Sequence, residues 1–367
     1  MAAARKRMLG EFVDGRANNF DLLRLFAALL VLVSHSLVLA GGDFNQLINI
    51  FGGYRTTSLG VYIFFVISGF LVAGSVERRS ILEYFVGRVL RIVPALAVVV
   101  FLTALVLGPV FTSLSVEEYF RSPQVYSYLT NAIPYSVQFY LPGLFTNLPL
   151  SGGVNGSLWT LPIESLCYVV LALLFMLGGR RLSLILPAML VVAGLLIWGG
   201  VTSDFDSTVL FGITMLPPVL QYGLMFLLGS TAWNFRNHIP LDGRLAFFCI
   251  VLLFVGSLLD YQKIFIYLGL PYLILYFAYR KPVLQEALEK VGDLSYGTYL
   301  ASFPIQQVIV YLMGGKMNGW VLAFMSAIVS MSLAAVSWRL IEKPATQLKF
   351  KIFKKPKIAS STGFPPL

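Results

Sequence analysis

The chain has 367 residues, of which 57% are hydrophobic and 12% are charged, whereas roughly a quarter of the residues in ordinary soluble domains are charged. With a mean hydropathy of +0.80, this composition excludes a soluble enzyme, a disordered protein and a disulfide scaffold, and it predicts an integral membrane protein. The net charge of +10 does not indicate a nucleic-acid partner, because the basic residues lie between apolar segments and not on one folded basic face. Cys167 and Cys249 both lie within apolar segments, which favours buried thiols over a disulfide or a metal pair.

Apolar stretches long enough to cross a bilayer, which takes about twenty residues of helix, recur along the chain. In chain order they lie near 20–40, 59–76, 91–110, 157–177, 182–200, 211–235, 245–260, 263–279, 294–313 and 319–340. They predict an all-α polytopic membrane protein of about ten transmembrane helices. The eighth is short, and Pro271 is expected to interrupt it. We expect a cytoplasmic N-terminal segment over 1–19, a membrane domain over 20–342 and a disordered basic cytoplasmic tail over 343–367, near anionic headgroups.

The distribution of charge orients these helices. An even number of spans puts both termini on one side, and all but four of the 27 Lys and Arg residues then share that side. The exceptions are Arg55, Arg121, Lys263 and Lys316. The positive-inside rule therefore predicts cytoplasmic N and C termini. Counting 124–141 as a further span would remove this asymmetry, and its Asn131 and Pro134 suit an interfacial or re-entrant segment better, so 110–156 is expected to be an external, aromatic loop.

Three ionisable residues lie in the first helix, where each is costly at mid-membrane depth. At about 100° per residue, Arg24 and His35 lie about 20° apart and Asp21 within about 60° of Arg24, which predicts one stripe facing the bundle. Asp21 and Arg24 have the spacing of an ion pair, and a purely structural pair is an equal alternative. His35 lies about 16 Å further along the helix. We favour a catalytic role for His35 over a helix-bundling hydrogen bond.

Two later segments carry further candidates. Arg88 and Arg91 lie three residues apart, on one helical face, where they could fork around phosphates; a positive-inside anchor is an equal alternative. Glu164 lies about two turns into the fourth helix and shares a face with Tyr168. A carboxylate at that depth needs a partner from another helix or a wet cavity, and a structural ion pair is the alternative.

These features together resemble the membrane-bound acyltransferase-3 family of sugar O-acyltransferases. The resemblance rests on six motifs in the family's order, which span almost the whole chain. They are Asn19 to Ala27 continuing to His35-Ser36, Gly60 to Leu71, Arg88-Val-Leu-Arg91 with Ile92-Val-Pro94, Trp159 to Tyr168, Ser295 to Leu300 with Phe303-Pro304, and Ser337 to Pro344.

The resemblance implies an acyl-CoA donor, most simply acetyl-CoA, on the cytoplasmic side of a bacterial inner membrane, and a glycan or lipid-linked sugar hydroxyl as acceptor. We expect no metal, because the chain has only two histidines and a site of several imidazoles is not available. The resemblance implies that His35 is the catalytic base, that Arg88 and Arg91 hold the donor, and that Glu164 supports the acceptor site. We also assign Arg24 to the donor site and count Glu164 as a second catalytic residue. The acceptor or supporting residues that we assign are Asp21, Tyr168, Trp159 and Ser302.

The chain departs from the family pattern in three ways. Tyr62 stands where many members have Asp, and Ser302 stands where many have a histidine before Phe-Pro, so His35 carries more weight here. The appended extracytoplasmic hydrolase-like domain of some members is absent from this sequence, so transfer is expected to finish within the membrane domain or on a separate extracytoplasmic partner. The rival hypothesis is a proton-coupled transporter or flippase, which the absence of internal repeats disfavours. The acceptor, the acyl chain and the oligomeric state stay open.

Overall fold

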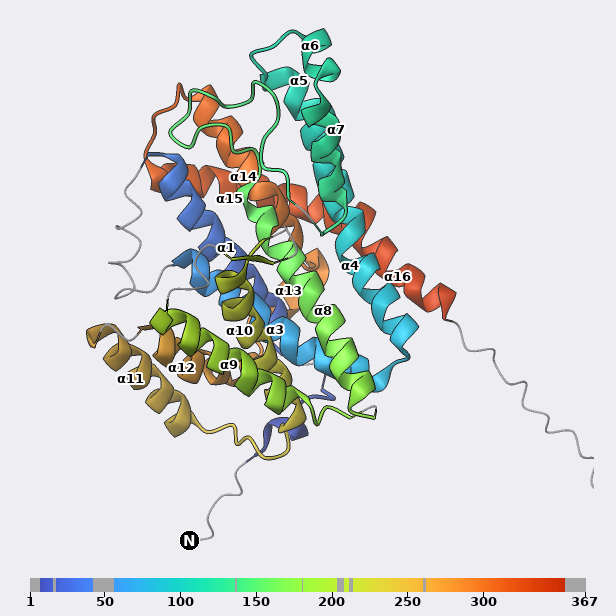
Figure 1. Cartoon of the computed structure of the whole chain (residues 1–367), viewed down its shortest axis with the longest axis vertical. Helices are drawn as coiled ribbons and strands as arrows, with labels where there is room; N and C mark the ends of the chain where they lie inside the picture. Colours follow the sequence, from blue (N-terminus) through green and yellow to red (C-terminus); the bar gives the residue numbers. More distant parts are fainter. Residues whose placement is uncertain are drawn as a thin grey trace, which may run out of the picture.

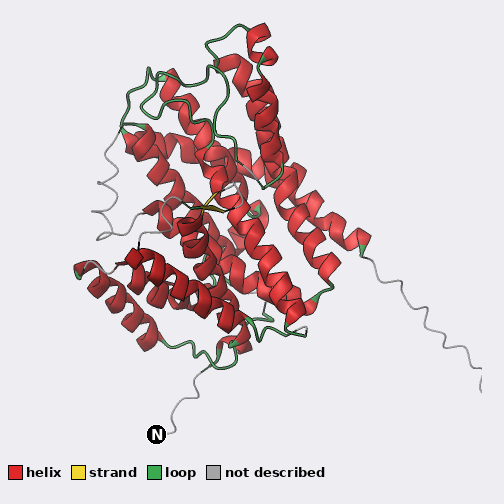
Figure 2. Cartoon of the chain, in the orientation of Figure 1, coloured by secondary structure: helices red, strands yellow, loops and turns green. Residues whose placement is uncertain are grey.

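The computed structural model describes the chain in eight segments. These are residues 7–15, 18–41, 56–135, 137–179, 181–202, 208–210, 214–259 and 262–353. Helices make up nearly all of the regular structure in these segments (Figure 2). The exception is a short antiparallel hairpin of β1 (Val209–Leu210) and β2 (Thr214–Met215). The predicted fold class, an all-helical membrane protein, is confirmed at this level.

Each of the ten expected spans contains a helix. In chain order these are α1 (Phe20–Leu39), α3 (Thr56–Arg78), α4 (Ile81–Leu102), α8 (Thr160–Leu177), α9 (Ile185–Thr202), α10 (Leu216–Asn234), α11 (Gly243–Leu258), α12 (Gln262–Ala278), α14 (Ser295–Leu312) and α15 (Gly319–Ser337). Short elements fill the connections: η1 (Leu9–Glu11), the π-helical η2 (Thr103–Leu107), α5 (Gly108–Phe111), α6 (Val116–Arg121), α7 (Pro123–Leu129), η3 (Thr130–Ala132), η4 (Gly156–Trp159) and α13 (Gln285–Val291).

Among the described residues, five continuous helical runs are long and apolar enough to cross a membrane. They are Phe20–Leu39, Ser58–Arg78, Ile81–Phe111, Gly156–Leu177 and Gly319–Ile352, and three shorter apolar helices accompany them, Ile185–Gly200, Gly243–Leu258 and Gln262–Ala278. The chain is therefore a multi-pass membrane protein, while the number ten stays a prediction. Residues 124–141 contain only the short α7 and η3, so a further long span there is excluded.

Three details differ from the sequence-based expectations. Helix α4 begins at Ile81, ten residues before the expected span, so Arg88 and Arg91 lie within the helix and not at its opening. Pro271 lies inside α12 without ending it, as is tolerated in membrane helices where neighbouring groups satisfy the freed carbonyl. The tail is not disordered from residue 343: α15 continues through the π-helical η5 (Trp338–Glu342) into α16 (Lys343–Ile352).

Helix α16 forms because its sequence suits one. Pro344 lies where η5 passes into α16, and it has no N–H to donate to the preceding turn. The Thr346 hydroxyl donates to the Glu342 carbonyl oxygen at 2.9 Å. The helix packs on α4 and buries Lys349 against it. In Figure 1 it extends beside α4. Residues 354–367 of the expected tail lie outside the described residues.

The centre of the bundle is the close packing of α3 with α1 and α10. A methyl group on Gly69 would lie 1.9 Å from the Phe226 carbonyl oxygen, and one on Gly229 would lie 2.2 Å from that of Val66. Small residues at such positions let two helix backbones approach, which is how helices associate in lipid. The Gly69 of the second motif therefore has a structural role. Figure 1 shows these helices between α8 on one side and α9, α11 and α12 on the other.

Helix α14 is tied to α1 by a buried amide. The Gln306 side-chain nitrogen donates to the Leu32 carbonyl oxygen at 2.7 Å and to the Ser36 hydroxyl at 2.6 Å. Gln307, the next residue, donates to the carbonyl oxygens of Leu150 and Gly153. These contacts fix the end of the 110–156 loop against α14, beside the half of α1 that carries His35.

Candidate active site

Two cavities share a wall inside the bundle. The first, of about 80 Å³, is lined on one side by Arg24, Arg88 and Arg91 and is called here the arginine cavity. The second, of about 520 Å³, is lined by His35 and is called here the histidine cavity. Val61 and Tyr299 line both cavities. The residues singled out on α1, α4 and α8 are therefore divided between two adjoining chambers.

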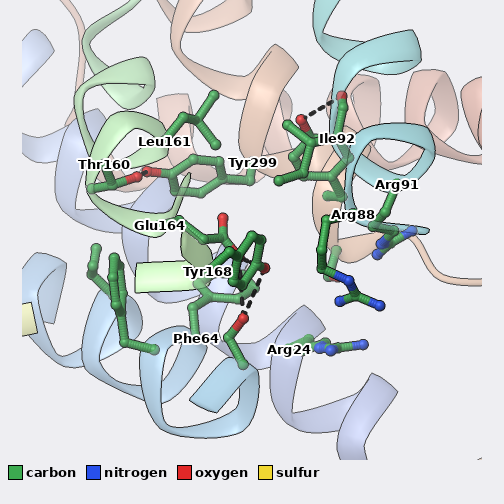
Figure 3. A pocket seen from close by; sticks show the side chains of 15 residues that line it. Arg24, Phe64, Arg88, Arg91, Ile92, Thr160, Leu161, Glu164, Tyr168 and Tyr299 are labelled. Atoms are coloured by element: carbon green, nitrogen blue, oxygen red, sulfur yellow. Dashed lines mark hydrogen bonds between the residues drawn. The ribbon is translucent and has the colours of Figure 1, made fainter. Parts of the chain in front are cut away.

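In the arginine cavity the three guanidiniums gather on one side and face Glu164, Tyr168 and Tyr299 on the other (Figure 3). Arg88 has a buried Nε without a hydrogen-bond partner among the described residues. Its guanidinium lies 5.7 Å from the centre of the Tyr168 ring, within the range of a cation–π contact. Arg88 is therefore a cation that is available to an anionic ligand.

Arg91 lies beside Arg88 but already has two carboxylate partners. One guanidinium nitrogen donates to Asp293 in a short contact, and another lies 3.3 Å from the Glu342 carboxylate. Asp293 also lies 3.9 Å from Arg24 and accepts from the backbone N–H of Ser295 at 3.0 Å. The predicted common face of Arg88 and Arg91 is confirmed, since both line the cavity, but Arg91 joins α4 to the start of α14 and the end of α15.

Glu164 lies in the arginine cavity and does not line the histidine cavity. Its carboxylate accepts a short hydrogen bond from the Tyr168 hydroxyl and a second from Ser68 of α3 at 3.2 Å. No Lys or Arg of the described residues lies within ion-pair distance of it. The expected partner from another helix is therefore the Ser68 hydroxyl, and the ion-pair alternative is wrong for this carboxylate.

Tyr299 of α14 is held in the wall between the cavities. Its hydroxyl donates to the Ser157 carbonyl oxygen at 2.7 Å and shares a hydrogen bond with the Thr160 hydroxyl, also at 2.7 Å. The edge of its ring meets Phe64, with ring centres 5.7 Å apart. Tyr299, hydrogen-bonded to η4 and the start of α8, thus forms with Val61 the wall between the arginine cavity and the histidine cavity.

Six aromatic side chains line the histidine cavity. Trp159 and Tyr222 form an edge-to-face pair with ring centres 5.5 Å apart, and the 110–156 loop contributes residues to the lining. The aromatic residues that line it are Phe139, Tyr140, Trp159, Tyr222, Tyr299 and Phe303. Flat apolar rings of this kind match the C–H faces of sugar rings.

His35 lies in this cavity against the edge of Phe303, with ring centres 5.1 Å apart. Its Nδ1 is buried and has no hydrogen-bond partner among the described residues. A helix-bundling hydrogen bond through Nδ1 is thus not made. An unpaired buried nitrogen is costly in a structure, and here it lies on a group suited to proton transfer.

Two assigned residues lie apart from these cavities. Asp21 is 3.8 Å from Arg24, so the i, i+3 pair is confirmed, but its side chain is 58% exposed at the start of α1, so the predicted stripe facing the bundle is wrong for Asp21. Ser302 lines neither cavity and donates to the Tyr299 carbonyl oxygen of its own helix at 3.4 Å. It does not take the position of a second base.

Sequence reasoning missed the residues that complete the site. Asp293 and Glu342 satisfy Arg91, and Ser68 satisfies Glu164. Tyr299, Ser68 and Glu342 lie in the motifs quoted above, but their spacing along the chain does not predict which residues they contact. Tyr222 lies in none of these motifs, and nothing in the sequence predicts its place in the site.

The fold and the site define a multi-pass helical membrane protein in which the arginine cavity and the histidine cavity adjoin each other across a shared wall. The acyltransferase-3 family model, described as an acyltransferase domain, matches residues 18–339, and the chain belongs to this family. It is 31% identical over 339 residues to an O-acetyl transferase of Shigella phage Sf6, covering 89% of this chain and 96% of that protein. It is 30% identical over 368 residues to nodulation protein 10 of Rhizobium leguminosarum bv. viciae, covering 92% of this chain and 96% of that one. No solved structure matches.

Proposed function

We propose that the protein is an O-acetyltransferase that moves an acetyl group from acetyl-CoA to a hydroxyl of a cell-surface glycan or lipid-linked sugar. The observation that carries the proposal is the wall shared at Val61 and Tyr299. It puts an arginine-lined chamber next to the chamber of His35, whose Nδ1 has no hydrogen-bond partner among the described residues. The similarity to a phage O-acetyl transferase supports the choice of acetyl. Membership in an acyltransferase family favours chemistry over the rival carrier function.

The donor would enter from the arginine side. Arg88, free of carboxylate partners among the described residues, and Arg24, whose carboxylates lie 3.8 and 3.9 Å away, are suited to the phosphates of a nucleotide. The arginine cavity of about 80 Å³ is much smaller than the pockets of about 300–1,000 Å³ that usually hold cofactor-sized ligands. The pantetheine arm therefore needs the side chains of the shared wall, Val61 and Tyr299, to move before the thioester reaches His35.

The acceptor would occupy the histidine cavity. Its 520 Å³ and aromatic lining fit a sugar ring stacked on Trp159 or Tyr222. His35 takes the proton from the acceptor hydroxyl as its oxygen attacks the thioester carbonyl, the C–S bond breaks, and the imidazolium returns the proton to the departing CoA thiolate. Glu164 and Tyr168 then act on the donor side of the wall, and not beside the acceptor.

Transfer across the wall implies an orientation of the chain. The arginine cavity would face the cytoplasm, where acetyl-CoA is made, and the histidine cavity the outside of a bacterial inner membrane. Ten spans with both termini cytoplasmic satisfy this arrangement and the positive-inside rule.

Purified protein in nanodiscs, supplied with radiolabelled acetyl-CoA and a panel of glycans, tests the function directly. We expect label on a glycan hydroxyl, lost on mild alkaline treatment as an ester is, and one thiol of CoA released per acetyl transferred. Labelled glycan from wild type but not from His35→Gln protein would support the proposal. Uptake of label or of a lipid-linked sugar into vesicles, without ester formation, would establish the carrier function in its place.

Arg88→Lys should raise the KM for acetyl-CoA by about tenfold or more, because lysine cannot fork onto a phosphate and charge-assisted hydrogen bonds are worth about 1.5–3 kcal/mol. Membrane insertion should be unchanged, since the positive charge stays. Steady-state kinetics with varied acetyl-CoA measure the effect, and Arg181→Lys, at an exposed arginine, is the matched control. A wild-type KM for Arg88→Lys would leave Arg88 only as a topology anchor.

Ser127→Cys should be labelled by a membrane-impermeant thiol reagent in intact cells. Ser127 lies in α7 and is exposed, and the proposed orientation places this helix outside. Wild-type protein gives the background, because both of its cysteines are free and buried. If labelling requires permeabilised cells, the proposed orientation is inverted.

A further inference from the structure

A second group of cations lies beside the arginine cavity, where α16 packs on α4. A methyl group placed on Gly87 would lie 3.5 Å from the Lys349 Nζ and 3.9 Å from a terminal nitrogen of Arg79. Gly87 directly precedes Arg88 in α4. Lys349 and Arg79 therefore converge on one point of α4, next to the arginine that lines the cavity.

One nearby carboxylate, that of Glu83, acts on both Arg79 and Lys349 without forming an ion pair with either among the described residues. No ion pair joins Lys349, Arg79 or Arg88 to a carboxylate within the segments that the structure describes. Lys349 is nevertheless only 7% exposed, which is rare for a lysine without a carboxylate partner. Its Nζ lies 5.3 Å from the centre of the Phe350 ring. Burial and then the neighbouring Arg88 lower the pKa of Arg79, against a smaller opposing effect of Glu83. Crowded positive groups of this kind are stabilised when an anion binds between them.

The local sequence makes room for this arrangement. Glycine is disfavoured inside a helix, yet Gly87 lies buried within α4. The Lys349 side chain lies across it: a methyl carbon added to Gly87 would be 3.2 Å from Lys349 Cδ. Lys351, two residues further along α16, is exposed. The burial of Lys349 is thus specific to its position and is not shared by the lysines of this helix in general.

We propose that Lys349, Arg79 and Arg88 form a phosphate-binding site that takes the 3′-phosphate on the adenosine end of acetyl-CoA. The inference rests on the proposed function. Acetyl-CoA is a long molecule with the thioester at one end, the diphosphate between and the 3′-phosphate on the adenosine at the other end. When the thioester lies toward Tyr299 and the diphosphate at Arg88 and Arg24, the 3′-phosphate lies beyond Arg88, where Lys349 and Arg79 converge. An anionic lipid headgroup is the other source of the same phosphate chemistry.

The test compares the Kd of CoA with that of 3′-dephospho-CoA for the full chain in nanodiscs of phosphatidylcholine alone, by titration calorimetry. Wild type should bind CoA about tenfold more tightly or better, as expected for charge-assisted hydrogen bonds to one phosphate. Lys349→Gln should bring the two Kd values close together while leaving that of 3′-dephospho-CoA unchanged. Lys349→Arg should keep the preference, and so should Lys351→Gln, which removes the same charge from an exposed position of α16.

The other outcomes separate the possibilities. If wild type binds CoA and 3′-dephospho-CoA equally well, the site is refuted while the proposed donor stands. If Lys349→Gln weakens both ligands equally, Lys349 has a structural role and the proposal is wrong. If Lys349→Gln alters only the retention of phosphatidylglycerol in mixed nanodiscs, the phosphate is that of a lipid and the proposal is overturned. If wild type binds neither ligand and transfers no acetyl group, the proposed function fails before this inference is tested.

Discussion

His35→Gln should lower the rate of acyl transfer by about 10²–10⁴-fold, the usual contribution of a general base, while the protein folds, inserts and binds CoA normally. Glutamine keeps the volume and a hydrogen-bonding end but cannot accept and release a proton near neutral pH. The His35 Nδ1 has no hydrogen-bond partner among the described residues, so the substitution removes no bond of Nδ1 that holds the bundle together. Single-turnover transfer of labelled acetyl to the acceptor measures the chemical step, and CoA binding measured separately reports the integrity of the arginine cavity.

The matched control is Ser58→Ala. Ser58 lines the same histidine cavity from α3, so its truncation changes the cavity without touching the base, and transfer should stay within a fewfold of wild type. His35→Ala should be as inactive as His35→Gln. A well-folded His35→Gln protein that turns over at nearly the wild-type rate would remove His35 from the mechanism, and the histidine cavity would then be an acceptor pocket without a base.

The helices of this fold follow from the sequence because apolar residues in lipid leave the backbone little choice. Hydropathy located the helices but not their ends. Helix α4 begins ten residues before its apolar span since Ser80 caps it, accepting from the Glu83 N–H at 3.2 Å. Helix α16 could not be predicted from hydropathy, because its lysines lower the local hydropathy to that of a disordered tail. Packing against α4 stabilises the helix.

The division of the site could not be predicted in the same way. Angular spacing relates residues on one helix, and it correctly put Arg88 and Arg91 on one face and Glu164 with Tyr168. It does not say which chamber a face meets. Trp159 lines the histidine cavity and Glu164, about 7.5 Å further along at 1.5 Å per residue, lines the arginine cavity. Two residues only five positions apart, at the start of α8, thus line different cavities. The position of the wall between the cavities is set by the neighbouring helices, which the sequence of α8 does not indicate.

The meeting of distant motifs also required the structure. Arg91 in the third motif contacts Asp293, just before the fifth, and Glu342 in the sixth. These two carboxylates are almost completely buried, with side chains 8% and 1% exposed. Burial by itself raises the pKa of Asp293, but the Arg91 and Arg24 guanidiniums outweigh it and hold that pKa below its ordinary value. Asp293 is therefore ionised at neutral pH, and its charge depends on Arg91.

Arg91→Met should consequently destabilise the protein by about 3–5 kcal/mol, the usual cost of removing one partner from a buried ion pair. The thermal midpoint, followed by tryptophan fluorescence in nanodiscs, should fall well below that of wild type. Arg88→Met, the matched control on the same face of α4, should keep the wild-type midpoint because Arg88 has no carboxylate partner among the described residues. The double variant Arg91→Met with Glu342→Gln should recover part of the loss. It removes both sides of the Arg91–Glu342 pair, which costs far less than removing one, while Asp293 keeps Arg24 at 3.9 Å. If Arg91→Met melts like wild type but no longer uses the donor, Arg91 binds the nucleotide directly. The ion pairs of Arg91 with Asp293 and Glu342 then do not hold α4, α14 and α15 together.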